Sequence, residues 1–235
     1  MKLQKMIVTN KDLREFNSLK IAVKAKYYIE CKTDRDLEVA FKFIKKNKIK
    51  FLILGEGTNV VFTKPFTGLI IKNVFKKEKK IYKNKVKVSS GYNWDRFVSF
   101  CINNSLYGLE NLSGIPGTVG AGPIQNIGAY GEEISDYIEH IEVYNFKTGN
   151  LETLNNMNCN FDYRYSFFKK NKHLFIKNVF FKLNDKFIAN NSYQDLQIYE
   201  FKNATQLRKR VLKIRKKKLE NYLRIPNVGS FFKNP

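Results

Sequence analysis

Glycine is concentrated in one short segment of this 235-residue chain. Seven of the thirteen glycines lie in GLENLSGIPGTVGAGPIQNIGAYG at positions 108–131, together with Pro116 and Pro123. Glycine permits positive φ and close backbone approach, and the interspersed isoleucines are not typical of a flexible linker. We expect an ordered loop, which could be a cradle of backbone N–H groups for a phosphate or a structural turn. We call it the second glycine loop.

The same region contains no basic residue. The chain has 43 Lys and Arg against 21 Asp and Glu, a formal net charge of +22, yet no Lys or Arg lies between Phe97 and Phe146. An even spread would put about nine basic residues there. Because Lys is rarely fully buried, the gap predicts that this 50-residue window is buried.

The charge elsewhere is mostly lysine, with 35 Lys and 8 Arg. Lys, Asn, Phe, Tyr and Ile have A/T-rich codons, so we attribute the excess to nucleotide composition. A nucleic-acid-binding protein is the competing interpretation. Arginine, which grips phosphates and guanines in fork geometry, is scarce, so we expect no nucleic-acid partner.

Several other classes of protein are not expected. The longest apolar runs, such as Phe51–Leu54, are too short to span a membrane. Met1 to Asn10 has no apolar core of a secretory signal. Three widely spaced cysteines and two isolated histidines offer no metal site and fit a reducing cytoplasm.

The chain reads as many short strands and few helices. Thr33 to Asp36 resembles a helix-capping box, and Asn93 can cap a second helix. The patterns predict strands at 51–54, 60–62, 69–74 and 175–183, hairpins at 81–90 and 141–154, and helices from 33, from 93 and over 204–219. Because the strands pair mostly with near neighbours, an α+β fold is expected.

A shorter glycine element, GEGTN at 55–59, follows the predicted strand 51–54. We call it the first glycine loop. It does not match the dinucleotide-binding fingerprint, because Val60 stands where a third glycine would be needed. Together the two loops suggest a ligand with a pyrophosphate, held by backbone N–H groups rather than by lysine.

Four motifs in order along the chain resemble the UDP-N-acetylenolpyruvoylglucosamine reductase family. They are the first glycine loop, the segment 108–133, FDYRYS at 161–166 and GSFFKNP at 229–235. The resemblance implies a two-domain FAD-binding fold of the vanillyl-alcohol-oxidase type, unrelated to the Rossmann fold. It implies FAD-binding subdomains at 1–66 and 67–210, with 211–235 starting a substrate-binding region that is largely missing.

The resemblance also implies a reaction. NADPH would reduce bound FAD, and hydride would then pass to C3 of UDP-N-acetylglucosamine enolpyruvate, leaving an enolate-like centre at C2 that a proton converts to UDP-N-acetylmuramate. This step serves peptidoglycan precursor synthesis, and through the cell wall it serves cell shape, cell cycle and division. A cytoplasmic monomer is expected.

Site residues follow from the same resemblance. Catalytic roles are expected for Ser230 and Arg164, and substrate contacts for Tyr163, Tyr193, Lys218 and Asn234. Contacts to FAD are expected from Gly55, Glu56, Gly57, Thr58, Asn59, Gly114, Ile115, Pro116, Gly117, Thr118, Gly120, Asn126, Gly128, Ala129 and Tyr130.

The residue types at the two catalytic positions suit that chemistry. Ser230 follows Gly229, which frees the backbone to present a hydroxyl, and an enolate-like centre is basic enough to take its proton. Arg164 is a permanent cation that could neutralise a substrate carboxylate. Without the resemblance, a turn hydroxyl and a surface ion pair would be equally ordinary interpretations.

The sequence departs from the family pattern in two ways. Members of the family continue beyond the serine motif with a third domain and a catalytic glutamate, whereas this chain stops at Pro235. Near the start, Lys20 stands where the family has glycine. Three explanations stay open: a truncated and decaying gene, a fragment of a longer product, or a shortened enzyme with weak activity. The alternative expectation for function is a truncated FAD-binding remnant with impaired turnover.

Overall fold

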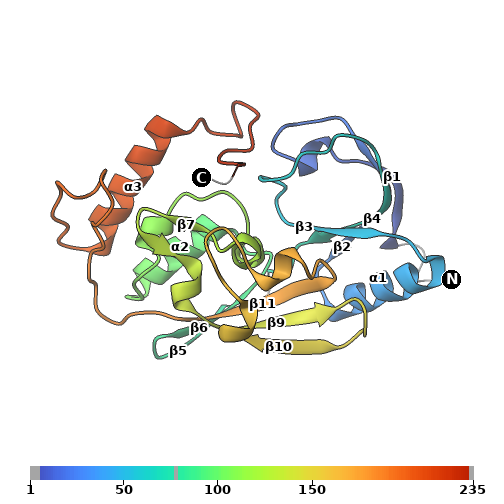
Figure 1. Ribbon diagram of the computed structural model, residues 1–235, viewed down its shortest axis with the longest axis horizontal. Helices are drawn as coiled ribbons and strands as arrows, with labels where there is room; N and C mark the ends of the chain where they lie inside the picture. The colour runs from blue at the N-terminus through green and yellow to red at the C-terminus, as the bar shows by residue number, and fades with distance from the viewer. Residues whose placement is uncertain (1–5, 77–78, 233–235) are drawn as a thin grey trace.

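The computed structural model describes residues 6–76 and 79–232, and it is built around two β-sheets. Figure 1 shows the first sheet beside α1 and the second sheet below the centre of the molecule. Short 3-10 helices connect the larger elements: η2 (Arg14–Phe16), η3 (Glu110–Leu112), η4 (Val119–Gln125), η5 (Ile134–Tyr137), η6 (Met157–Cys159) and η7 (Phe167–Lys169).

The first sheet has four strands in the order β1–β2–β4–β3. They are β1 (Val8–Asp12), β2 (Lys24–Cys31), β3 (Phe51–Leu54) and β4 (Phe66–Asn73). β4 runs parallel to both β2 and β3, and α1 (Asp34–Asn47) connects β2 to β3. The predicted capping box begins this helix: Thr33 accepts from the N–H of Asp36, whose carboxylate accepts in return.

The second sheet has five antiparallel strands in the order β10–β9–β11–β6–β5. They are β5 (Lys79–Tyr82), β6 (Lys85–Ser89), β9 (Ile138–Asn145), β10 (Leu151–Asn155) and β11 (Leu174–Lys182). A separate two-stranded ribbon joins β7 (Gly128–Ala129) and β8 (Glu132–Glu133).

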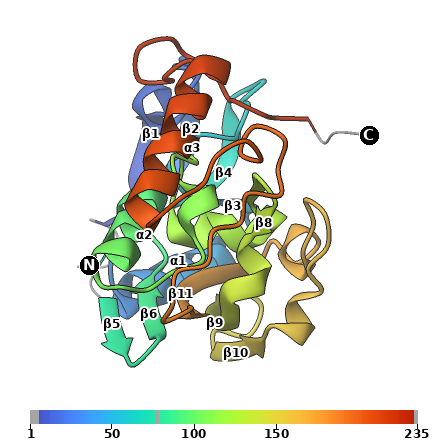
Figure 2. The same ribbon diagram turned by 90° about the vertical axis from the view of Figure 1, so that its left-hand side faces the viewer.

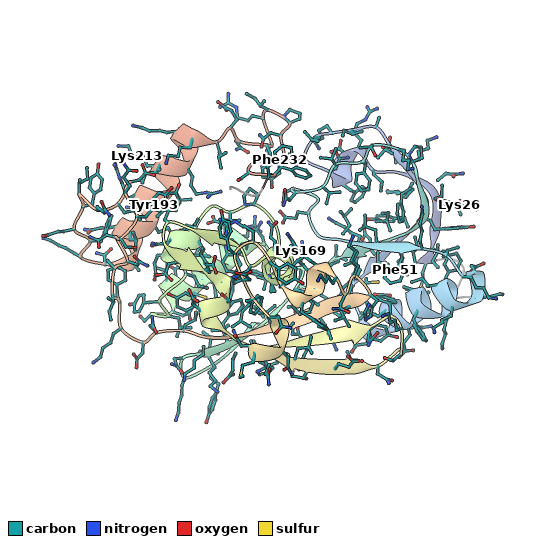
Figure 3. The ribbon with its side chains drawn as sticks, in the orientation of Figure 1. Lys26, Phe51, Lys169, Tyr193, Lys213 and Phe232 are labelled. Carbon is teal, nitrogen blue, oxygen red and sulfur yellow. The ribbon has the colours of Figure 1, made fainter. Side chains whose placement is uncertain are left out.

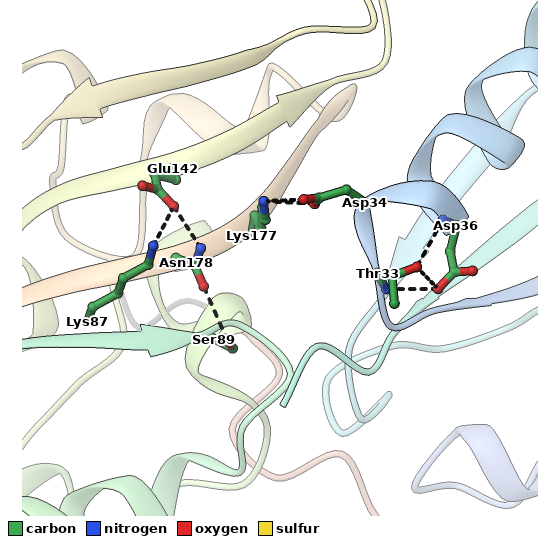
Figure 4. Close-up of polar contacts among 8 residues, drawn as sticks. All are labelled: Thr33, Asp34, Asp36, Lys87, Ser89, Glu142, Lys177 and Asn178. Carbon is green, nitrogen blue, oxygen red and sulfur yellow. Dashed lines mark hydrogen bonds and ion pairs between the residues drawn. The ribbon is translucent and has the colours of Figure 1, made fainter. Parts of the chain in front are cut away.

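α1 packs between the two sheets and joins them. Its buried face shares one apolar cluster with Ile71 of the first sheet and Tyr144 and Phe175 of the second. At the start of α1, Asp34 accepts an ion pair at 2.7 Å from Lys177 of β11, as Figure 4 shows. In the same view Asn178 donates to Glu142 at 2.7 Å. The sheets therefore form one packed body.

The lysine-free window from Phe97 to Phe146 is the centre of the second core. It includes most of α2 (Trp94–Asn103), both strands of the ribbon and β9, and only seven of its 50 residues are exposed. Trp94, Phe97 and Phe181 pack together there with ring centroids 5.0–6.3 Å apart. The predicted burial is confirmed.

After β11 the chain leaves this body and forms what we call the C-terminal arm, residues 184–232. It contains α3 (Ala204–Lys218), which lies at the end of the molecule opposite α1 in Figure 1 and beside α2 in Figure 2. Leu207, Val211 and Ile214 of α3 pack with Leu196 and Tyr130 in a small cluster of their own. No helix within the described ranges has the length and apolarity needed to cross a membrane.

Most of the predicted elements are confirmed, but the strand at 60–62 is wrong. Val60 to Phe62 has no strand pairing in the described part of the chain, and Phe62 packs on the first sheet as a loop residue. Sequence reasoning missed β1 and β2, and β1 is an exposed edge strand of mostly polar residues.

The expected domain limits fall inside regular elements. Phe66 begins β4, which pairs with β2 and β3, so the first sheet extends to Asn73. Residues 210 and 211 are both within α3. The division into functional subdomains stays a prediction.

Candidate functional site

The first glycine loop leaves the carboxyl end of β3 and is fixed by the N-terminal region. Gly57 has a φ of 73°, and a Cβ there would lie 2.1 Å from the carbonyl oxygen of Phe16. Only glycine fits this position. The N–H of Ser18 donates to the carbonyl of Gly57 at 3.1 Å. Lys20, at the position where the resemblance implies glycine, has a φ of 56° and so adopts the left-handed backbone.

Lys72 supports the same loop from the sheet. Its ammonium extends from β4, donates to the carbonyl of Gly55 and lies 5.8 Å from the ring centroid of Phe16. Burial lowers the pKa of Lys72, although the charges of Glu56 and Glu30 oppose that shift. Lys72 therefore holds the backbone of the first glycine loop, although burying its ammonium group costs desolvation free energy.

The second glycine loop is fixed to the chain between β6 and α2. The N–H groups of Val119 and Gly120 donate to the carbonyls of Tyr92 and Ser90 at 2.9 and 2.8 Å. Gly120 lies so close that a Cβ would be 2.4 Å from the Cβ of Ser90. Backbone hydrogen bonds hold this part of the loop in the body.

The two glycine loops touch each other. A Cβ on Gly55 would lie 3.2 Å from the Oγ1 of Thr118, and a Cβ on Gly117 would lie 3.4 Å from the Oγ1 of Thr58. The Nδ2 of Asn59 donates to the Oε1 of Gln125 at 3.1 Å. Segments far apart in the sequence thus form one continuous wall.

This wall borders a cavity of about 790 Å³, a size typical of ligand sites. From the predicted site the cavity is lined by Thr58, Asn59, Gly114, Ile115, Pro116, Gly128, Arg164 and Ser230. From the arm it is lined by Leu212, Arg215, Lys216, Leu219, Glu220, Asn221, Tyr222, Arg224, Asn227, Val228, Gly229, Phe231 and Phe232. Figure 3 shows Phe232 and Lys169, two lining residues, in the middle of the molecule.

The lining is strongly cationic. Arg164, Lys169, Arg215, Lys216 and Arg224 face a single acidic lining residue, which is Glu220. Such a concentration of positive charge favours a ligand that carries phosphates.

One buried polar atom beside the cavity suits a bound cofactor. Among the described residues, the Oδ1 of Asn59 has no hydrogen-bond partner, and Asn59 lines the cavity. A buried polar atom without a partner is costly, and a ligand seated there could pair with this side chain. The wall of glycine loops, Asn59 and the cationic lining therefore fit a dinucleotide such as FAD.

Arg164 reaches the cavity from a turn after η6. Its guanidinium donates to the carbonyl of Gly128 at 2.6 Å and lies 5.1 Å from the ring centroid of Tyr163. Among the described residues, none of the ion pairs involves Arg164. Its charge is held by neutral carbonyl and aromatic groups and so stays available to an anion.

Ser230 lines the cavity from the arm. Gly229 before it has a φ of 58°, and its N–H donates to Oδ1 of Asn227 at 3.0 Å.

Tyr222 connects the arm to the first glycine loop. Burial and the nearby charge of Glu56 raise the pKa of the Tyr222 hydroxyl. The 219–232 segment of the arm therefore returns to the first glycine loop.

Comparison with known proteins agrees with this geometry. A sequence model described as the FAD binding domain matches residues 25–155. The UDP-N-acetylenolpyruvoylglucosamine reductase of Buchnera aphidicola subsp. Baizongia pistaciae is 42% identical over 231 residues, which cover 95% of this chain and 69% of that protein. The reductase of Wigglesworthia glossinidia brevipalpis is 38% identical over 229 residues, covering 94% and 67%. This chain belongs to the UDP-N-acetylenolpyruvoylglucosamine reductase family.

Solved structures confirm the expected fold class. The UDP-N-acetylenolpyruvylglucosamine reductase of Thermus caldophilus aligns with a TM-score of 0.73 at 22% identity, over 97% of this chain and 74% of its own. The 6-hydroxy-D-nicotine oxidase of Arthrobacter nicotinovorans aligns with a TM-score of 0.56 at 12% identity, over 75% and 41%. The fold is the α+β FAD-binding type of these flavoenzymes and not a Rossmann fold.

In this family of FAD-dependent oxidoreductases, the expected substrate residues of our chain fall into two groups. Tyr163 neighbours Arg164 and is partly exposed. Tyr193 and Lys218 lie together in the arm, with the ammonium 5.9 Å from the Tyr193 ring centroid and hydrogen-bonded to Asp195. Figure 3 shows Tyr193 close to α3, at the outer edge of the molecule. Asn234 lies outside the described residues.

The remaining predicted FAD residues belong to the two loops but do not line the cavity. They are Gly55, Glu56, Gly57, Gly117, Thr118, Gly120, Asn126, Ala129 and Tyr130. The side chain of Asn126 donates to Glu133 at 2.7 Å and is almost fully buried. Tyr130 packs edge-on against Tyr193 with ring centroids 5.3 Å apart. Their contacts to FAD stay predictions.

Sequence reasoning missed three charged residues of this site. Lys72 was read only as part of a strand, and Arg215 only as part of a basic helix. Asp95 accepts from the N–H of Gly114 at 2.6 Å and binds Arg208 of α3. The one available signal was Lys72, a charged residue directly after the apolar run Leu69 to Ile71 in the predicted strand.

Proposed function

We propose that this chain reduces UDP-N-acetylglucosamine enolpyruvate to UDP-N-acetylmuramate, with NADPH as electron donor. The observation that supports this most is that both glycine loops, Arg164 and Ser230 line one cavity. The reaction would supply peptidoglycan precursors for the cell wall, and hence for cell shape and division, and would be carried out by a cytoplasmic monomer.

FAD would be held by the two glycine loops. Asn59 would offer its unpartnered side-chain oxygen, and Gly114 to Pro116 would offer backbone at the cavity surface. When bound, FAD supplies the hydride that reaches C3 of the enolpyruvyl group. The protein's contribution to that transfer is to orient the cofactor and exclude competing reactions.

The cationic lining would bind the phosphates of the substrate and of NADPH. Arg215, Lys216 and Arg224 present three positive charges from the arm, and guanidinium groups pair with phosphate oxygens in two-pronged geometry. Tyr193 and Lys218 are the further substrate contacts that we propose in the arm. Arg164, held by neutral groups, would neutralise the carboxylate of the enolpyruvyl group as charge develops there.

Ser230 would then complete the reaction. Hydride at C3 and a proton at C2 together convert the enolpyruvyl ether to a lactyl ether. The hydroxyl of Ser230 would donate that proton, because an enolate-like carbon is basic enough to take a proton from an alcohol. Gly229 allows the turn that presents this hydroxyl to the cavity.

The test is turnover of NADPH with the enolpyruvyl substrate by the FAD-loaded chain and by Ser230→Ala. We expect Ser230→Ala to lower kcat by about 10²–10⁴-fold, because proton transfer contributes that much. FAD affinity and reduction of the flavin by NADPH should be unchanged, since neither step needs this proton. Thr205→Ala, an exposed hydroxyl on α3, is the matched control.

Two outcomes would contradict parts of the proposal. Full turnover by Ser230→Ala would exclude this serine as the proton donor. A chain that binds FAD and shows flavin absorbance but no turnover would support the alternative expected from the sequence, an FAD-binding protein with impaired catalysis.

A further inference from the structure

The first turn of α2, residues 93–95, touches both glycine loops and α3. Asn93 caps the helix by accepting from the N–H of Arg96 at 3.0 Å, and its Nδ2 donates to the Oε1 of Glu56 at 3.1 Å. One side chain thus begins α2 and ties it to the first glycine loop.

Trp94 fixes the second glycine loop at two points. Its backbone N–H donates to the carbonyl of Gly117 at 3.0 Å, and its indole Nε1 donates to the carbonyl of Leu112 at 2.8 Å. The side chain is 1% exposed. Because the ring is locked in the core, these two bonds hold the loop on a rigid support.

Asp95 connects the same loop to the arm. Its Oδ1 accepts from the N–H of Gly114 at 2.6 Å, and Arg208 of α3 donates to Oδ1 at 2.6 Å and to Oδ2 at 2.8 Å. This is the two-pronged arginine–carboxylate arrangement, which is stronger and more directional than a single bond. The Arg208 side chain is 16% exposed, so solvent screens the pair less than a surface pair.

The residues after Arg208 on α3 are those that line the cavity. Leu212 and Arg215 follow it at helical spacing, and Lys216 is next along the chain. Leu212 already lies against the loop, because a Cβ on Gly114 would be 2.7 Å from its Cδ2. A shift of α3 would therefore move the cationic side of the cavity relative to the glycine loops.

The electrostatics keep this junction ionised. Burial by itself raises the pKa of the Asp95 carboxyl, but hydrogen bonds from Arg208 and Gly114, with the charges of Arg208 and Arg215, lower it overall. Asp95 also lies in the first turn of α2, where the helix dipole favours a negative charge.

We propose that Asp95 is a positioning residue that couples α3 to the second glycine loop, so that FAD meets a cavity whose cationic side is already in place. The part of this proposal that concerns FAD binding rests on family membership and on the residues that line the cavity. Only its extension to the phosphates of NADPH and substrate rests on the proposed function.

The experiment measures FAD affinity by flavin fluorescence for Asp95→Asn, Arg208→Ala and the double variant. We expect each single variant to raise the FAD dissociation constant about tenfold, equivalent to roughly 1.4 kcal/mol. The double variant should be no weaker than either single variant, because both remove the same junction. Arg96→Ala and Lys209→Ala, exposed neighbours on α2 and α3, should stay within twofold.

A second readout separates positioning from general stability. Hydrogen exchange should rise in the amides of α3 in Asp95→Asn and Arg208→Ala, while Trp94 fluorescence shows the same thermal midpoint as the unchanged chain. Arg208→Lys, which keeps the charge but not the two-pronged geometry, should give an intermediate FAD affinity.

Three outcomes would overturn the proposal: single variants that change FAD affinity less than twofold, losses that multiply in the double variant, or α3 exchange that does not change. If Asp95→Asn does not fold, Arg208→Ala tests the same junction from α3. If Asp95→Asn or Arg208→Ala lost turnover while FAD affinity stayed unchanged, the proposal would be wrong, but the proposed function would still stand.

Discussion

The two sides of the cavity differ in character. The body side consists mainly of the glycine loops, which are half-buried and held largely by backbone hydrogen bonds, and its basic lining residues are Arg164 and Lys169. The arm side is cationic and exposed, and it has a small apolar cluster around Leu207 and Val211. Phe232 and Leu223 in the arm are 85% and 74% exposed.

This difference suggests a division of work. A cofactor that stays bound needs a preorganised site, which the packed body provides through its fixed glycine loops. A substrate that enters and leaves needs a surface that can open, and regions with few buried contacts open most readily. We therefore expect body substitutions to affect folding and FAD, and arm substitutions to affect local opening and turnover.

The largest expected effect compares one glycine from each side. Gly57→Ala should lower the free energy of unfolding by about 3 kcal/mol, because the added Cβ meets the carbonyl of Phe16 at 2.1 Å in a left-handed backbone. Gly229→Ala has similar φ but nothing within 4 Å of the added Cβ. It should cost only local strain of about 1 kcal/mol.

The measurement is urea unfolding followed by the fluorescence of Trp94, the single tryptophan in the chain, together with the flavin absorbance of the purified protein. Gly57→Ala should lose both stability and flavin, whereas Gly229→Ala should keep its flavin and lose only about 1 kcal/mol. Equal losses from the two substitutions would show that the arm unfolds with the body and would remove the contrast.

A smaller effect is expected where the arm touches the body. Tyr193→Ala removes the edge-on contact with Tyr130, worth about 1 kcal/mol. Proteolysis of the 184–203 segment should therefore become roughly fivefold faster, since cleavage follows local opening. Tyr193→Phe keeps the ring and serves as the control. A lowered global unfolding midpoint in Tyr193→Ala would instead make the arm part of the cooperative body.

The sequence predicted the body better than the arm. The capping box at Thr33, the cap at Asn93 and the hairpin around Lys83 depend on neighbours in the chain, so local patterns were enough to predict them. The strand pairing of β4 with β2 and β3 depends on distant segments, and Val60 to Phe62 is apolar because it packs on a sheet, without being a strand.

Prediction of the functional site from the sequence was limited in the same way. Both glycine loops and Ser230 could be identified from motifs that resemble a family. The residues that hold these motifs in place could not, because Lys72 and Asp95 act through contacts to loops 17 and 19 residues away in the chain. The Asp95–Arg208 pair spans 113 residues and leaves no local signature.

The smallest effect concerns two lysines that titrate in opposite directions. Burial lowers the pKa of Lys72 in the body, whereas the hydrogen bond from Lys218 to Asp195 raises the pKa of Lys218 in the arm. At pH values between the lowered pKa of Lys72 in the folded chain and its ordinary pKa of 10.5, the unfolded chain binds more protons at Lys72 than the folded chain does. Lys72 therefore makes the free energy of unfolding rise with pH in this range. Lys218 keeps its proton above 10.5, so its contribution is lost as pH rises through the raised value.

Comparison of the chain with Lys72→Met and Lys218→Met across alkaline pH tests this. Unfolding of the body is followed by Trp94, and unfolding of the arm by a fluorophore on Thr205→Cys, since the three native cysteines are buried. The stability difference for Lys72→Met should grow with pH below 10.5, and that for Lys218→Met should shrink above it. If both differences moved in the same direction, burial would not distinguish the two lysines. The contrast between a desolvated body and a solvated arm would then have no electrostatic basis.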